Sequence, residues 1–103
     1  MRRGEIRWYK FSHPDKKRPV LILTRNSIIE YLGEVTVAPL TSTVRDIPSE
    51  VPLGRNEGMA RDCAVNCDHL QTVSKAKLGA LIATLPSSKL AEVRQAIHFA
   101  LGL

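Results

Sequence analysis

Apolar residues along this chain fall in short segments, and most of these segments have the two-residue period of a β-strand. Residues 4–11 alternate, with Ile6 and Trp8 on one side of the strand that they predict. Residues 18–24 form a continuous apolar run rich in branched side chains, which predicts a strand buried on both faces. We expect Pro19 at the start of that strand, because proline cannot donate a hydrogen bond in the middle of a sheet.

Turn-forming residues separate the further strands that the same pattern predicts. Pro39 is expected to end one of them, and Asp68 and His69 mark a kink between two others. These strands are expected at residues 34–39, 47–53, 62–67 and 70–73, with a strand or mixed segment at 78–85. The chain should therefore form about six short strands, mostly antiparallel.

Helical spacing occurs in two places. Residues 26–32 can form one or two turns, with Asn26 as the N-terminal cap and Gly33 as the stop. A longer helix is expected near the end of the chain, capped by Ser87 or Ser88. Its apolar positions, which share one helical face, are Leu90, Val93, Ile97 and Leu101.

These elements predict a mainly β fold with appended helices, namely a small, partly open antiparallel barrel with a C-terminal helix. The 103 residues suit one domain, and no internal repeat or linker divides them, so a single domain should span residues 1–103. A domain of this size has a thin core, and oligomerisation would help to stabilise it.

The charge of the chain is the next constraint. Fifteen Lys and Arg residues against ten Asp and Glu residues give a net charge of +5. Such an excess favours a polyanionic partner, although an ordinary soluble protein can carry it too. No apolar run approaches the roughly 20 residues of a membrane span, and no apolar signal segment follows the first arginines. We therefore expect a cytoplasmic protein with no membrane partner.

The two cysteines, Cys63 and Cys67, bear on redox state and on metal binding. On a strand over 62–67 their Cα atoms would lie about 13 Å apart, whereas a disulfide needs roughly 4.4–6.8 Å. A zinc site would need His69 and a fourth ligand, and no paired cluster of ligands supplies one. We expect buried free thiols, no metal and no cofactor.

Two clusters could bind phosphate. The first stands where a loop enters a buried strand; a guanidinium there can hold a phosphate through two hydrogen bonds, although a solvated basic turn is the commoner case. The second follows another strand, and its hydroxyl groups and arginine can bind phosphate or satisfy their own backbone. The first cluster is Lys16, Lys17 and Arg18, and the second is Thr41, Ser42, Thr43 and Arg45.

A third cluster, at residues 66–69, places a carboxylate beside an imidazole, which could act as an acid–base pair. Adjacent strand residues point to opposite faces, so Asp68 and His69 need not face one site. His13 lies in a polar loop from which it could reach a substrate, whereas His98 on the last helix is more typical of a structural residue. Fingerprints of serine-nucleophile elbows, P-loops and dinucleotide sites are absent.

Five segments, taken in order, carry a resemblance to a known family. They are RGEIRW at 3–8, KRPVLIL at 17–23, VAPLTS at 37–42, AVNCD at 64–68 and DHLQTV at 68–73, followed by the terminal helix. In order and spacing they resemble the MazF/PemK/Kid family of toxin ribonucleases, over essentially the whole chain.

The resemblance implies an SH3-like barrel of the CcdB/MazF type that forms a homodimer. It implies a metal-independent, sequence-selective endoribonuclease of a type II toxin–antitoxin system, which cuts single-stranded RNA to leave a 2′,3′-cyclic phosphate and a 5′-hydroxyl. It also implies a small, acidic cognate antitoxin that lays a peptide across the RNA groove. The alternatives are a CcdB-like toxin that inhibits DNA gyrase without catalysis, and an RNA-binding barrel without activity.

By position, the catalytic arginine and threonine of the family correspond to Arg18 and Thr41. A guanidinium and a hydroxyl could stabilise the extra negative charge that develops when a ribose 2′-OH attacks phosphorus. Some members have an acid-role arginine where this chain has Asn66, so the acid–base group is open, with His13 and Asp68 as candidates. RNA binding is expected from Lys16, Lys17, Ser42, Thr43, Arg45, Arg55 and Asn66.

Overall fold

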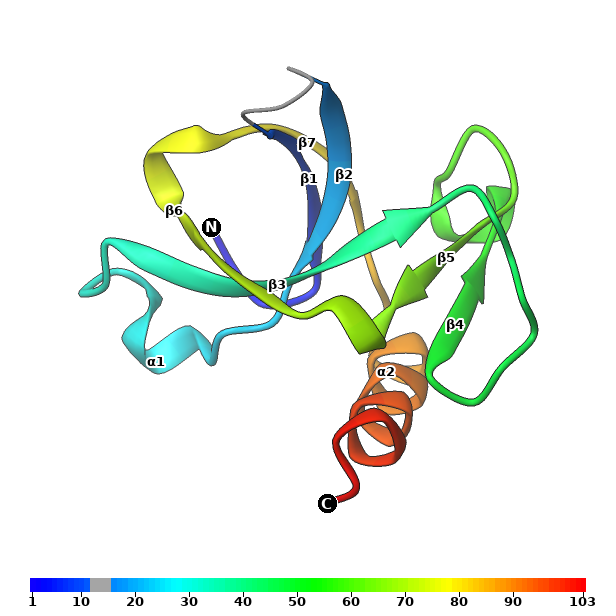
Figure 1. Cartoon of the computed structure of the whole chain (residues 1–103). Helices are drawn as coiled ribbons and strands as arrows, with labels where there is room; N and C mark the ends of the chain where they lie inside the picture. Colours follow the sequence, from blue (N-terminus) through cyan, green and yellow to red (C-terminus); the bar gives the residue numbers. More distant parts are fainter. Residues whose placement is uncertain (12–15) are drawn as a thin grey trace.

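The computed structural model describes residues 1–11 and 16–103, which form a curled antiparallel sheet with a helix packed at one end (Figure 1). The described strands are β1 (Glu5–Lys10), β2 (Lys17–Ile22), β3 (Glu34–Thr41), β4 (Glu50–Leu53), β5 (Cys63–Asn66), β6 (Gln71–Ser74) and β7 (Leu78–Thr84). The helices are α1 (Asn26–Ile29) and α2 (Ser87–Leu101), with 3₁₀ turns η1 (Arg55–Glu57), η2 (Cys67–His69) and η3 (Lys75–Lys77).

Strand β3 is the centre of the sheet. The strand order is β4-β5-β3-β2-β1-β7, and β6 pairs with β3 outside this path. One edge of β3 pairs with β2, while the other pairs first with β6 and then, at Leu40 and Thr41, with β5. The predicted mainly β, antiparallel fold with a C-terminal helix is confirmed, with seven strands in the described residues instead of about six.

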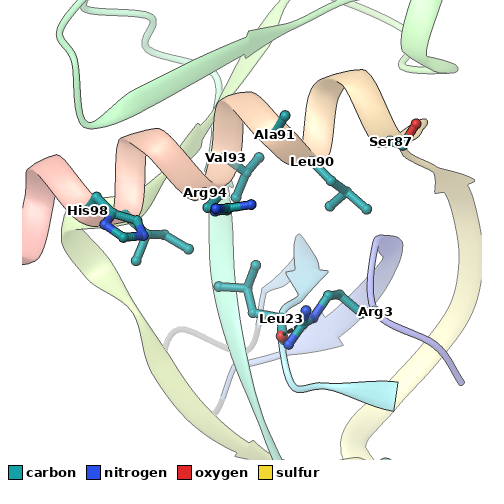
Figure 2. Close-up of a pocket in the computed structure, with 9 residues that line it drawn as sticks. Arg3, Leu23, Ser87, Leu90, Ala91, Val93, Arg94 and His98 are labelled. Carbon is teal, nitrogen blue, oxygen red and sulfur yellow. Dashed lines mark hydrogen bonds between the residues drawn. The ribbon is translucent and has the colours of Figure 1, made fainter. Parts of the chain in front are cut away.

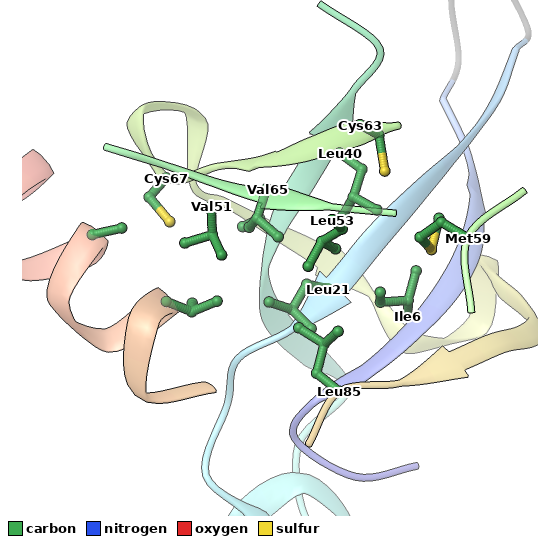
Figure 3. Packing of buried hydrophobic residues seen from close by; sticks show 13 residues of the cluster. Ile6, Leu21, Leu40, Val51, Leu53, Met59, Cys63, Val65, Cys67 and Leu85 are labelled. Carbon is green, nitrogen blue, oxygen red and sulfur yellow. The ribbon is translucent and has the colours of Figure 1, made fainter. Parts of the chain in front are cut away.

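Hydrophobic side chains are buried on both faces of the sheet. On β2, Val20 and Ile22 belong to one buried cluster and Leu21 belongs to the other, and all three are 0% exposed. This confirms the prediction of a strand buried on both faces. The cluster that contains Leu21 also packs Val51 of β4 and reaches α2 (Figure 3). The domain therefore has two thin cores that share β2 and β3 as a wall.

Pro39 lies inside β3, so the expectation that it ends a strand is wrong. The backbone N–H of Leu23 donates to the carbonyl of Thr36, so residue 36 and alternate residues along β3 direct their N–H groups toward β2. Pro39 is therefore turned toward the opposite edge, in the interval between the residues that pair with β6 and with β5. It has no N–H to donate to that edge, where β3 pairs at this residue with neither β6 nor β5.

Pro19 is the third residue of β2 and not its first, and it limits the pairing of β2 with β3. The register makes Leu21 and Ala38 a hydrogen-bonded pair, so Pro19 and Leu40 would be the next such pair. Proline has no N–H to donate, and the ladder stops one residue before it. Beyond this point β3 pairs with β5 instead.

The helices differ from expectation at their N-termini. Pro86 is the N-cap of α2 and no side chain caps the helix, so the expectation that Ser87 or Ser88 does so is wrong. The fixed φ of proline already suits a helix start, and both serines fall inside the first turn. Asn26 does not cap α1 either, because its Oδ1 accepts the backbone N–H of Arg3 at 2.7 Å. Among the described residues no helix is long and apolar enough to cross a membrane.

Strand β4 begins at Glu50, later than the expected residue 47. Asp46 has a left-handed φ of 53°, and the backbone N–H of Glu50 donates to the carbonyl of Ile47 at 3.0 Å. This hydrogen bond closes a turn over residues 47–50, which removes the first part of the apolar run from the sheet.

Cys63 and Cys67 are free and buried, as expected. Burial raises the pKa of the Cys63 thiol. Burial, with a smaller contribution from the Asp68 carboxylate, raises the pKa of Cys67 to about 11 from its ordinary value of 9.0. Both thiols are therefore neutral near pH 7. In the described ranges, no group of three or more His, Cys, Asp or Glu side chains could hold a metal ion.

The raised pKa of Cys67 predicts a loss of stability at alkaline pH. The folded state disfavours the thiolate. The contribution of the neutral Cys67 thiol to the free energy of unfolding is therefore complete below pH 9 and disappears as the pH rises from 9 toward 11. The loss should be on the order of 2 kcal/mol, measured by urea unfolding at stepped pH. Cys67→Ala should show a shallower fall in unfolding free energy over that range, although its cavity lowers stability at every pH. Equal slopes in the two proteins would contradict the prediction.

Candidate active site

Strands β2 and β3 bring Arg18 and Thr41 together. Their register pairs Val20 with Pro39, and the same register continued by two residues would set Arg18 opposite Thr41. Alternate residues share a face of a strand, so both lie on the face that carries Val20. Because the ladder has already ended, the two side chains flank a gap between diverging strands and not a continuous sheet.

An open hollow of about 320 Å³ lies at this gap, and we name it the Arg18 hollow. It is lined by Phe11, Lys16, Arg18, Pro39, Leu40, Thr41, Arg45, Asn66, His69 and Gln71. Arg18 and Lys16 are exposed, and neither side chain has a hydrogen-bond partner among the described residues. Two cations that have no partner in the described part of the chain, close to a hydroxyl, form a surface suited to an anion such as phosphate.

The hydroxyl of Thr41 is held in one orientation. Its Oγ1 accepts the backbone N–H of Thr43 at 3.1 Å. One lone pair is thus occupied, and the O–H has no acceptor among the described residues, so it is available to donate. A donor that is fixed before substrate arrives can stabilise developing charge without reorganisation.

The turn η2 sends Asp68 and His69 to different places. Asn66 caps this turn, since its Oδ1 accepts the backbone N–H of Asp68 at 3.1 Å. The hydroxyl of the buried Ser49 donates to Asp68 Oδ2 at 2.6 Å, and Asp68 does not line the Arg18 hollow. His69 does line it. The imidazole of this pair, and not the carboxylate, therefore borders the space between Arg18 and Thr41.

Arg45 lines the same hollow but is tied to the protein. Its Nη1 donates to Glu50 Oε2 at 3.2 Å, and its backbone N–H donates to Oε1 of the same carboxylate at 3.0 Å. The Glu50 side chain is only 2% exposed, while that of Arg45 is 54% exposed. Arg45 thus compensates a buried negative charge, and its guanidinium contributes less free positive charge to the hollow than Arg18 does.

A second hollow, of about 360 Å³, adjoins the first, and we name it the Trp8 hollow. Leu40 and Thr41 line both hollows, so the two adjoin at the end of β3. The Trp8 hollow is lined by Trp8, Pro19, Leu40, Thr41, Ser42, Met59, Ala60, Arg61, Asp62, Cys63 and Ile82.

The remaining predicted residues are dispersed. Ser42 lies in the Trp8 hollow, and Arg55 lies in a further hollow formed around η1. Lys17 and Thr43 are exposed and line neither the Arg18 nor the Trp8 hollow. His13 lies outside the described residues, so its place relative to the site stays a prediction.

A separate hollow lies between α2 and the start of the chain (Figure 2). Arg3, Leu23, Leu90, Arg94 and His98 are among the residues that line it, and it contains none of the predicted site residues. The predicted chemistry is therefore concentrated at the opposite end of the strands, where β2 and β3 diverge.

Comparisons with known proteins agree with this arrangement. A family model described as the PemK-like, MazF-like toxin of type II toxin–antitoxin systems matches residues 2–101. The chain belongs to this family.

Named relatives cover nearly the same length. The endoribonuclease MazF3 of Mycobacterium tuberculosis is 43% identical over 86% of each chain, and the probable endoribonuclease MazF2 of the same species is 36% identical over 99% of each. Among solved structures, the M. tuberculosis toxin MazF-mt6 has a TM-score of 0.88 at 39% identity and covers 96% of this chain and 97% of its own. A mycobacterial endoribonuclease solved with its cognate antitoxin has a TM-score of 0.90 at 26% identity and covers 100% of this chain and 96% of its own.

Sequence reasoning did not single out Phe11 and Gln71 of the Arg18 hollow, and it treated His69 only as the imidazole of an acid–base pair with Asp68 or as a metal ligand. Its side chain reaches the hollow because η2 replaces extended chain directly after β5. The turn-forming pair at 68–69 was visible in the sequence, but the direction in which it would send each side chain was not.

The Arg45–Glu50 pair predicts a stabilising role for Arg45. Arg45→Ala leaves a buried carboxylate with only a backbone donor, which should lower the free energy of unfolding by about 1–2 kcal/mol. Arg55→Ala is the matched control, because that exposed guanidinium has no partner among the described residues, and its effect should stay within about 0.5 kcal/mol. Urea denaturation measures both. Equal effects of the two substitutions would show that the pair adds no stability.

Proposed function

We propose that this chain is the toxin of a type II toxin–antitoxin system and acts as a metal-independent, sequence-selective endoribonuclease on single-stranded RNA. The observation that carries the proposal is that Arg18 and Thr41 line the same open hollow. Family membership and relatives that are named endoribonucleases support it. We further propose that residues 1–103 are one domain, since the family model spans nearly all of them.

In the proposed reaction, the 2′-oxygen of a ribose attacks the adjacent phosphorus, and the bond from phosphorus to the 5′-oxygen of the next nucleotide breaks. The attacking oxygen loses a proton and the leaving oxygen gains one, so the products are a 2′,3′-cyclic phosphate and a 5′-hydroxyl, and no water is consumed. Arg18 binds the phosphoryl oxygens through two N–H groups, and the Thr41 O–H donates a third hydrogen bond. Dependence on the 2′-OH excludes DNA as a substrate.

We propose His69 as an acid–base group, in addition to the candidates His13 and Asp68. His69 lines the Arg18 hollow, and imidazole can both accept and donate a proton near neutral pH. The Asp68 carboxylate accepts the Ser49 hydroxyl, and Asp68 does not line the hollow. Asn66 has no titratable proton, and its amide nitrogen can bind a phosphate or base edge.

Partners follow from the same proposal. The single-stranded RNA substrate is met by Arg18, Lys16 and the hydroxyls at the end of β3. A small, acidic cognate antitoxin is proposed to cover this surface, consistent with the solved complex of a structural relative with its antitoxin. We propose a homodimer acting in the cytoplasm. The gyrase-directed alternative is not favoured, because the relatives reported above are named endoribonucleases.

Substitution of the two central residues tests the proposal. In EDTA, the purified protein should cut single-stranded RNA, and end-mapping should show 5′-hydroxyl ends. Thr41→Val preserves the shape but removes the donor, which should lower the cleavage rate by about 10²–10³-fold. Arg18→Ala should abolish cleavage, and Arg18→Lys should not restore it, because lysine lacks the planar fork.

Arg55→Ala serves as the control for these variants. It removes one positive charge from the surface, as Arg18→Ala does, but Arg55 lies outside the Arg18 hollow. It should reduce RNA affinity and its salt dependence slightly without changing the maximal rate. RNA left intact by the folded wild-type protein, across varied sequences, would refute the proposed function. Wild-type rates in Thr41→Val would refute the role of that hydroxyl.

The acid–base group is identified by pH–rate profiles. If His69 accepts the 2′-OH proton, cleavage by the wild type falls toward acid pH, and His69→Asn removes that acid limb together with most of the rate. His13→Asn and Asp68→Asn, each measured over the same range, should retain the limb. If instead His13→Asn or Asp68→Asn loses the acid limb while the profile of His69→Asn is unchanged, the residue substituted in that variant, and not His69, transfers the proton.

A further inference from the structure

The Trp8 hollow is an opening at the rim of a core and not a gap within it. Trp8 shares a face of β1 with the fully buried Ile6, yet Trp8 is 40% exposed. Leu40 and Met59 belong to the buried cluster that contains Ile6, and Ile82 packs against that cluster. The apolar wall of the core is therefore continuous with the surface here, and an indole ring stands at the mouth.

The position of the Trp8 hollow relative to the Arg18 hollow limits what it can bind. Thr41 lines both, and the β2–β3 ladder that would separate them has ended before this point. A group bound in the Trp8 hollow thus lies beside Thr41, as does a phosphate bound in the Arg18 hollow. In single-stranded RNA the group attached closest to a phosphate, through one ribose, is a nucleobase.

We propose that the Trp8 hollow receives one unpaired base of the nucleotide next to the scissile phosphate, with the base stacked on Trp8. This inference rests on the proposed function and adds a base-binding subsite to it. A volume of about 360 Å³ lies in the range of small-ligand pockets, which starts near 300 Å³. Aromatic side chains in protein grooves bind unpaired bases by stacking on their rings.

Asp62 gives this subsite a preference among bases. Its carboxylate lines the hollow, is exposed and has no hydrogen bond or ion pair with any described residue. A free carboxylate repels phosphate, but it accepts a hydrogen bond from an exocyclic amino group, which cytosine, adenine and guanine carry and uracil lacks. The neighbouring Arg61 keeps this wall attractive to the RNA backbone. The subsite therefore selects an amino-bearing base over uracil.

Trp8 is the only tryptophan of the chain, so intrinsic fluorescence reports on this hollow directly. The probes are 2′-O-methyl oligonucleotides of adenosine, cytidine or uridine, which lack the attacking hydroxyl and stay intact. Saturable quenching is expected, with tighter binding of the adenosine and cytidine oligomers than of the uridine oligomer. Anisotropy of a fluorescently labelled oligomer measures the same binding independently of the indole.

Two substitutions, each with a matched control, complete the test. Trp8→Leu should weaken oligomer binding about 5- to 150-fold by anisotropy, which corresponds to the loss of one stacked base. Phe99→Leu is its control, because this exposed aromatic residue on α2 lines neither hollow. Asp62→Asn should reduce the preference for cytidine and adenosine over uridine, whereas Glu92→Gln on α2 should leave it unchanged.

The outcomes separate this inference from the proposed function. Oligomers that bind by anisotropy without altering Trp8 fluorescence would overturn the base subsite, even if the wild-type protein cuts RNA. Quenching by a protein partner but not by any oligomer would also overturn it and assign the hollow to that partner. If Trp8→Leu does not fold, the wild-type titration decides alone. Intact RNA alongside base-dependent quenching would refute the ribonuclease and retain the subsite.

Discussion

The early end of the β2–β3 ladder is the constraint on which the rest of the site depends. Pro19 stands where the next ladder donor would be required, and it has no N–H. Strand β3 continues beyond that point by pairing with β5 on its other edge. The two strands therefore separate beside Arg18 and Thr41, and both side chains line the hollow that lies there.

Much of the fold could be predicted from the local pattern, because a strand that is buried on both faces has a recognisable run of apolar residues in the sequence. Val20, Leu21 and Ile22 of the predicted apolar run are buried, and the two-residue period of a strand decides which of them enters each core. The errors fall where one residue's role depends on partners far along the chain. Whether Pro39 ends a strand depends on what lies across each edge of β3, and whether Asn26 caps a helix depends on Arg3.

The site was only partly accessible from sequence, for a related reason. Arg18 and Thr41 were found through family motifs, and the register of two strands then explains why those positions adjoin. The Trp8 hollow had no sequence signal, since Trp8 reads as one more apolar residue of an alternating strand. Its exposure is consistent with the thin core of a small domain, in which part of a strand can lie at the rim of the packed side chains.

The distribution of carboxylates argues that the two hollows bind different parts of one strand. Near the Arg18 hollow, Glu50 is paired with Arg45 and Asp68 accepts the Ser49 hydroxyl, so neither opposes a phosphate there. In the Trp8 hollow, Asp62 has no such partner among the described residues. A surface that bound only phosphate would bind it more tightly if all three carboxylates, those of Glu50, Asp68 and Asp62, were neutralised. Leaving one acceptor free beside an exposed indole is consistent with a wall that meets the uncharged, donor-bearing edge of a base, while the charge of the backbone is met at Arg18.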